Sequence, residues 1–189
     1  MSAVAEIALQ EAVAPPPVLV IDPEKQYEYV NGHVEVKEMA GARHSRIGAR
    51  LLARMLLYVE ENNLGAVYGP DATFTIGERQ RMPDVSFVSA ARIPPEGDPV
   101  GIWTIAPDLA VEVVSPNDLH EDVVEKIHEY FAACVQQVWL LSPQFKTFTI
   151  YTTPTRSMTL TEEDELTCEE LLPGFRCSVR ALFQPPVHA

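Results

Sequence analysis

The chain has 189 residues, of which 47% are hydrophobic and 22% charged, so it is long enough for one globular domain with a buried core. Its formal net charge of -13 argues against nucleic-acid binding over the whole surface, because such binding depends largely on Lys and Arg contacts to phosphates. Three cysteines without a CxxC pair exclude a zinc ribbon and complete disulfide pairing, which favours a reducing compartment.

The two ends of the chain differ in composition from its middle. Residues 1–17 are rich in Ala and Pro, so we expect an N-terminal arm, one domain over 18–184 and a tail over 185–189. The N-terminus lacks the basic start and apolar core of a signal peptide, and no apolar run is long enough to cross a bilayer. These features predict a cytoplasmic protein without a membrane span.

Residues 27–30 and 33–36 are two short strand-like runs joined by Asn31-Gly32. Asn-Gly readily adopts the two positive φ angles of a type I′ turn, so this stretch predicts a β-hairpin. Glu28 and Glu35 lie on its two strands.

A helix is predicted over 43–62, with Gly65 following its end. Its core face comprises Ile47, Leu51, Leu52, Met55, Leu56 and Val59. Beside this face runs a row of four arginines, Arg43, Arg46, Arg50 and Arg54, with no acid between Met39 and Val59. The row is either a solvated helix face or a phosphate-binding surface, and we weigh the two equally. His44, on the apolar side of the first turn, is either a hydrogen-bonded core residue or part of a site.

Short strands are predicted at 66–69, 72–76 and 85–88, and Asp84 precedes the last of them. After a loop over 90–106, the apolar run 109–114 predicts a strand buried on both faces. Glu112 lies within this run, where a carboxylate costs several kcal/mol unless it is paired, protonated or bound to a metal. Its neighbours offer no compensating charge. Glu112 therefore lies at a sheet edge, pairs with an ordinary Arg, or belongs to a functional site, and we favour the last.

A second helix is predicted up to residue 133, with its N-cap in the turn 115–118. Lys126 lies at the seam between the apolar stripe of this helix and solvent, so its amine can reach back toward the end of the strand that carries Glu112. Viewed within the helix alone, Lys126 instead pairs with a nearby acid such as Glu129. Later strands are predicted at 137–141, 145–151 and 156–161, with Trp139 in the core. The acidic run 162–170 predicts a solvated segment, and 171–183 a short strand and a final helical turn.

Asp108 and Glu112 cannot easily share a cation, because four residues of strand separate their Cα atoms by about 13 Å. Asp84, on a different strand, can lie beside Glu112 at the carboxyl-side rim of adjacent strands, with Lys126 approaching from the helix. Two carboxylates suit Mg²⁺, which keeps several waters and commonly binds phosphate substrates. No P-loop, GxGxxG, HExxH or GxSxG motif is present, which argues against the commonest nucleotide-binding, protease and hydrolase classes.

The order and spacing of these segments resemble the Uma-two family of endonucleases, in the restriction-endonuclease-like PD-(D/E)XK superfamily. The resemblance covers about residues 25–184 and is carried by YEYVNGHVEV, His44, PDVSFV, PDLAVEVVSPND, EKIHEYFAACVQQVWLLSP and LPGF. It implies an α/β fold in which helices flank a mixed central β-sheet, with an N-terminal β-hairpin.

The same resemblance implies metal-dependent hydrolysis of phosphodiester bonds, with Mg²⁺ or Mn²⁺ as cofactor and DNA as substrate. Asp84 matches the PD aspartate and Glu112 the (D/E) residue, and these two would bind the metal. Val114 stands where the superfamily has its lysine, and the family resemblance transfers that role to Lys126. The early glutamate matches either Glu28 or Glu35. The alternative function is a catalytically silent binding or regulatory module. A homodimer is compatible with the family but does not follow from the sequence.

Overall fold

The computed structural model describes residues 26–30, 33–37, 41–115 and 118–186. The expected arm over 1–17, the Asn31-Gly32 turn and the last three residues of the expected tail lie outside these ranges. Within the described residues, no helix combines the length and hydropathy needed to span a bilayer.

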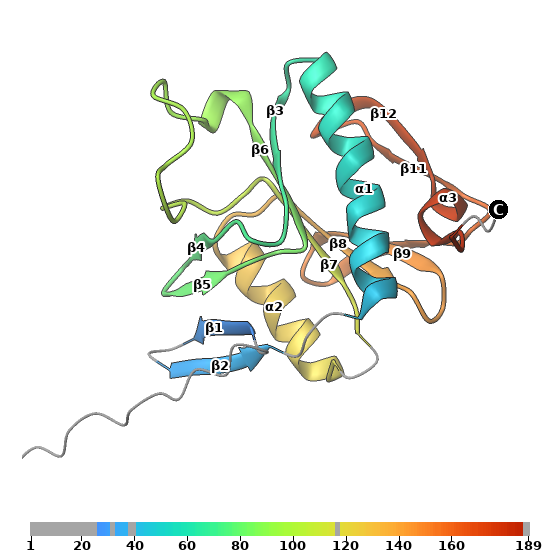
Figure 1. Cartoon of the computed structure of the whole chain (residues 1–189), viewed down its shortest axis with the longest axis horizontal. Helices are drawn as coiled ribbons and strands as arrows, with labels where there is room; N and C mark the ends of the chain where they lie inside the picture. Colours follow the sequence, from blue (N-terminus) through green and yellow to red (C-terminus); the bar gives the residue numbers. More distant parts are fainter. Residues whose placement is uncertain (1–25, 31–32, 38–40, 116–117, 187–189) are drawn as a thin grey trace, which may run out of the picture.

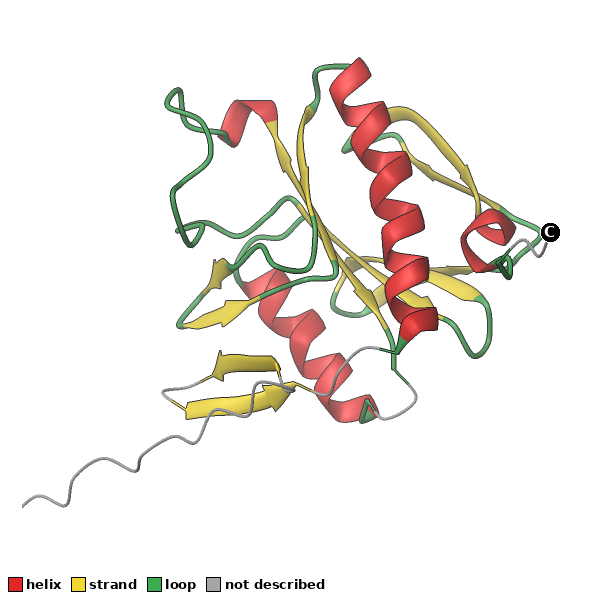
Figure 2. Cartoon of the chain, in the orientation of Figure 1, coloured by secondary structure: helices red, strands yellow, loops and turns green. Residues whose placement is uncertain are grey.

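A six-stranded mixed sheet forms the centre of the fold (Figure 2). Its strands are, in spatial order, β10 (Arg156–Leu160), β9 (Thr147–Thr153), β8 (Gln137–Ser142), β7 (Leu109–Val113), β6 (Val85–Ser89) and β3 (Gly65–Tyr68). β7 and β8 run parallel, and all other neighbouring strands of this sheet run antiparallel. The predicted α/β fold with a mixed central sheet is confirmed, and the strand that carries Glu112 lies in the interior of the sheet.

Helices and short hairpins surround this sheet (Figure 1). The helices are α1 (Ala42–Glu61), α2 (His120–Ala132), α3 (Val179–Phe183) and the 3₁₀ turn η1 (Ala90–Arg92). The hairpins are β1–β2 (Gln26–Val30 and His33–Lys37), β4–β5 (Phe74–Ile76 and Arg79–Arg81) and β11–β12 (Glu165–Cys168 and Leu172–Ser178). The structure has the predicted N-terminal hairpin and both long helices, whereas β5 was not predicted. The N-cap prediction for α2 is wrong, because the cap is Leu119 and makes no side-chain capping bond.

The two faces of the sheet carry separate hydrophobic cores. Side chains alternate along β7. Val111 and Val113 therefore pack with α1, β12 and α3 in what we call the first core, whereas Ala110 packs with α2 and the β4–β5 hairpin in the second core. Trp139 belongs to the first core and is fully buried, as predicted. In the second core, Trp103 from the long loop stacks on Phe74 with ring centroids 6.1 Å apart. Each long helix is therefore fixed over one face of the same central strands.

The connection from α1 to β3 depends on Gly65. α1 ends at Glu61, and Asn63 then adopts a left-handed conformation with φ of 53°. Gly65 has φ of 147°, and a Cβ built there would lie 2.1 Å from the carbonyl oxygen of Val88. Since only glycine fits this close approach, the backbone can turn sharply from the helix into the sheet.

The acidic run over 162–170 differs from its prediction. We expected a solvated segment, but β11 lies within it, and Leu166 and Cys168 are buried against the first core. The alternation of apolar and polar residues, rather than the high charge, decides the structure here, because the pairing with β12 turns one side of the strand inward.

Asp108, immediately before β7, is a fully buried carboxylate that joins four segments. It accepts hydrogen bonds from the Ser89 N–H at 2.7 Å, the Arg92 guanidinium at 2.9 Å and the Gln136 side-chain amide at 2.6 Å. Burial alone raises the pKa of this carboxyl, but the hydrogen bonds from Ser89 and Arg92 outweigh it and hold the pKa of Asp108 below its usual range. Asp108 is thus structural and stands apart from Glu112.

Asp108→Asn should lower the free energy of unfolding by about 2–4 kcal/mol at neutral pH, because it removes the charge that these donors stabilise. Since the folded-state pKa lies below the unfolded value, the contribution of Asp108 is present above the unfolded pKa and is lost as the pH falls through the folded pKa. Urea unfolding of both proteins from pH 7 to acid should therefore show a difference that shrinks below about pH 4. Asp164→Asn, at an exposed carboxylate that accepts hydrogen bonds from Thr161, is the control. An equal effect of the two substitutions would contradict this role.

Candidate active site

The register of β6 against β7 brings Asp84 next to Glu112. Val85 pairs with Val111 at the end of the antiparallel ladder, so Asp84 stands one position beyond it, across from Glu112. The expected carboxyl-side rim holds for β7 but is wrong for β6. Asp84 precedes the amino end of β6, while Glu112 lies near the carboxyl end of β7, because the two strands run in opposite directions.

Asp84 is held by groups from both the sheet and α1. Its Oδ2 accepts a hydrogen bond from the Val113 N–H at 2.7 Å and lies 3.4 Å from Nε2 of His44. The Asp84 side chain is 11% exposed. His44 sits in the first turn of α1, so the helix that packs on one face of the sheet delivers its imidazole to the strand end. A carboxylate bound in this way keeps one orientation at the rim of the sheet.

Among the described residues, the Glu112 side chain has two partners, both from α2. The Tyr130 hydroxyl donates to Oε1 at 2.6 Å, and Lys126 Nζ lies 3.6 Å from Oε2. The Glu112 side chain is 13% exposed and that of Lys126 26% exposed, so the site is shielded but open to solvent. The positive charge that compensates Glu112 thus comes from Lys126 on α2, the next helix of the chain.

Sequence reasoning missed Tyr130. Helix periodicity places Tyr130 on the apolar stripe of α2 as a core residue, and it is indeed 1% exposed. Two signals could have found it: a buried tyrosine hydroxyl normally requires a hydrogen-bond partner, and Tyr130 follows Lys126 by four residues, which places both on one helix face.

The donor set of this site fits a small hard cation. Two carboxylates from neighbouring strands, Asp84 and Glu112, match a metal such as Mg²⁺ that binds few protein oxygens and retains several waters. The described residues contain no group of three or more His, Cys, Asp or Glu side chains placed to hold a metal ion. Among the described residues, Asp84 and Glu112 are the candidate ligands at this point, and solvent would supply the rest of a Mg²⁺ shell.

The arginine row of α1 does not form one uniformly exposed surface. Arg43 and Arg54 are exposed, whereas Arg46 and Arg50 are half-buried. Arg50 donates to the carbonyls of Leu182, at 3.2 Å, and Gln184, and so satisfies the end of α3. Packing of α3 against α1 gives Arg50 a structural contact that helix periodicity alone does not reveal.

The model of a family described as Uma2, "Putative restriction endonuclease", matches residues 11–180. The chain belongs to the Uma2 family. Because this match covers most of the chain, the resemblance found in the sequence is confirmed.

A solved structure has a similar fold to this Uma2 protein. It is described as a putative nuclease belonging to DUF820 from Anabaena variabilis ATCC 29413, and it matches with a TM-score of 0.74 at 23% sequence identity. The match covers 83% of this chain and 89% of the other. No curated protein matches the chain. The family description supports a nuclease function for this chain, and the solved structure shows a shared fold.

The β1–β2 hairpin of this Uma2 chain carries the two candidates for the early glutamate. Glu28 and Glu35 face each other in the β1–β2 register, but their side chains lie outside the described part of the structure, so neither is placed relative to Asp84.

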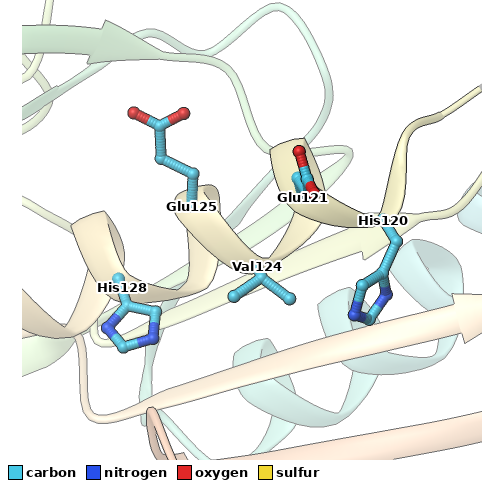
Figure 3. A pocket seen from close by; sticks show the side chains of 5 residues that line it. All are labelled: His120, Glu121, Val124, Glu125 and His128. Carbon is cyan, nitrogen blue, oxygen red and sulfur yellow. The ribbon is translucent and has the colours of Figure 1, made fainter.

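A hollow on α2 is lined by His120, Glu121, Val124, Glu125 and His128. Figure 3 shows His120, Val124 and His128 projecting to one side of the helix and Glu125 to the other. None of these residues contacts Glu112 in the described structure, so we do not assign the hollow to the site.

Proposed function

We propose that this Uma2 protein is a metal-dependent endonuclease that hydrolyses phosphodiester bonds of DNA. The main support is that three residues lie at one end of the central strands: Asp84 immediately before β6, Glu112 on β7 and Lys126 on α2. A purely structural role explains these three residues less well, because the cost of removing buried charges from water largely offsets the stability that their pairing adds to the fold. The three free cysteines fit our further proposal of a cytoplasmic location.

Each residue has a distinct role in this proposal. Asp84 and Glu112 would hold Mg²⁺ or Mn²⁺, which when bound stabilises negative charge that develops on a phosphate. Lys126 would place a second positive charge at the same point, to orient the attacking water or to stabilise the phosphate in the transition state. His44 would keep the Asp84 carboxylate in place through its 3.4 Å contact.

Calorimetry and plasmid cleavage test this function on the full-length protein. We expect the wild type to bind Mn²⁺ and Mg²⁺, and to nick or linearise supercoiled DNA with either ion but not in EDTA. Binding of the ions without cleavage of DNA or RNA would favour the alternative of a silent binding or regulatory module. Binding of neither ion would refute the metal-dependent function.

DNA contact requires positive charge in a chain of formal net charge -13. Arg43 and Arg54 are the exposed members of the arginine row, and Arg43 also donates to the carbonyl of Pro143, in the turn that follows β8. Arg43 lies one residue from His44, which contacts Asp84. We propose that Arg43 and Arg54 contact phosphates, with Arg46 and Arg50 as weaker candidates because their side chains are half-buried.

Changing Arg43 and Arg54 together to Ala should weaken DNA binding and reduce the slope of log K against log salt by about 1.8, because each phosphate contact contributes about 0.9. Fluorescence anisotropy over a salt series measures this slope. Arg176→Ala is the matched control, since Arg176 is exposed and pairs with Glu165 at 2.9 Å on β11. An unchanged slope in the double variant would leave the row as a solvated helix face.

A further inference from the structure

Tyr130 offers an interaction that the proposed reaction has not yet used. Its side chain is 1% exposed, and its hydroxyl donates a hydrogen bond of 2.6 Å to Oε1 of Glu112. The ring packs in the second core beside Ile127, so the position of the hydroxyl is set by the fold. Because the buried Tyr130 donates its hydrogen bond to Glu112, it fixes the orientation of the Glu112 carboxylate.

We propose that Tyr130 is a positioning residue that engages Oε1 of Glu112 and so presents the other oxygen, Oε2, to the cation. This inference rests on the proposed function. Rotation of the carboxylate out of its observed orientation would break the Tyr130 hydrogen bond. The second oxygen already faces positive charge, because Lys126 Nζ lies 3.6 Å from Oε2. Tyr130 and Lys126 are one helical turn apart on α2 and approach the two oxygens separately.

This arrangement has a consequence for metal choice. Mg²⁺, with its small octahedral shell, is commonly held through one or two carboxylates and waters, whereas Ca²⁺ accepts both oxygens of one carboxylate in a flexible shell. A donor on Oε1 opposes two-oxygen coordination by Glu112. Tyr130 should therefore favour Mg²⁺ and Mn²⁺ over Ca²⁺, a selectivity that a residue acting only in packing would not produce.

Tyr130→Phe tests the proposal, because it keeps the buried ring and deletes the hydroxyl. We expect its affinity for Mn²⁺, measured by calorimetry, to fall about 10-fold, the lower end of the range for residues that support a metal ligand. Its affinity for Ca²⁺ should fall less or rise, so the ratio of the two affinities should narrow. The thermal unfolding midpoint of the variant should stay near that of the wild type.

Tyr58→Phe is the matched control. Its hydroxyl also donates a hydrogen bond of 2.6 Å, to the carbonyl of Pro173, and it contacts the first core on the other face of the sheet. This variant should leave both metal affinities unchanged. An unchanged Mn²⁺ affinity in Tyr130→Phe, or equal losses for Mn²⁺ and Ca²⁺, would overturn the positioning role while the proposed function stands. A wild type that binds neither Mn²⁺ nor Mg²⁺ would overturn both.

Discussion

Glu112→Gln should abolish DNA cleavage and lower the affinity for Mn²⁺ by more than about 100-fold, the upper end for residues that merely support a metal ligand. Glutamine keeps the size of the side chain and an oxygen that can accept from the Tyr130 hydroxyl, so the fold should persist. It removes the negative charge, which is the property that attracts a divalent cation. Calorimetry with Mn²⁺ and a plasmid cleavage assay measure the two effects.

Glu165→Gln is the control for this substitution. Glu165 is an exposed carboxylate on β11 that pairs with Arg176 at 2.9 Å, and its loss should change neither quantity. The assignment of Glu112 as a metal ligand would be wrong if Glu112→Gln bound Mn²⁺ as tightly as the wild type. In that case the contacts with Tyr130 and Lys126 would be a structural network at the end of β7.

Lys126→Ala should separate catalysis from metal binding. We expect cleavage to fall by about 10²–10³-fold, the size found when one charged or hydrogen-bonding group that stabilises a transition state is removed. Metal affinity should be retained or rise slightly, because Lys126 places a positive charge 3.6 Å from Oε2 of Glu112 and so opposes a cation there. Single-turnover cleavage at saturating Mg²⁺ isolates the catalytic effect.

Lys146→Ala serves as the matched control, since Lys146 pairs with Glu162 at 3.0 Å on the surface, its side chain being 47% exposed. Both cleavage and metal binding should match the wild type in this variant. Cleavage by Lys126→Ala at the wild-type rate in Mg²⁺ would refute the idea that α2 supplies the lysine of the site. Simultaneous loss of metal binding would instead assign Lys126 to holding Glu112 in place.

The contact between Lys126 and Glu112 shows what can be predicted from the local sequence. Val114 occupies the place two residues after Glu112, and β7 ends at Val113. Because α2 begins only a few residues later, its first turns must start near the strand end, and a lysine at the seam of the helix can return to the strand. Connection length and helix periodicity allowed this contact but favoured a pair with an acid of the same helix such as Glu129, and the family resemblance decided for Lys126 as a residue of the site.

Tyr130 and Arg50 show where local sequence stops. Helix periodicity gives the face on which each of them lies, but their hydrogen-bond partners, Glu112 and the end of α3, lie on other elements. Helix periodicity predicts the face on which a residue lies, but it does not predict which residues from other elements pack against that face. The buried residues of β11 escaped prediction for a similar reason, since its pairing with β12 outweighs the high charge of the segment.

The sequence by itself determined the fold class, the family resemblance, the strands that carry Asp84 and Glu112 and the helix that carries Lys126. The individual strands and helices follow from local patterns of alternation, helical periodicity and turn residues. The fold class follows from the family resemblance, which rests on the order and spacing of the motifs along the chain. Only the tertiary structure decided that β6 and β7 are antiparallel neighbours in a register that places Asp84 across from Glu112. Strand direction and register are set by pairing and packing between distant segments, and no short window of sequence contains both partners.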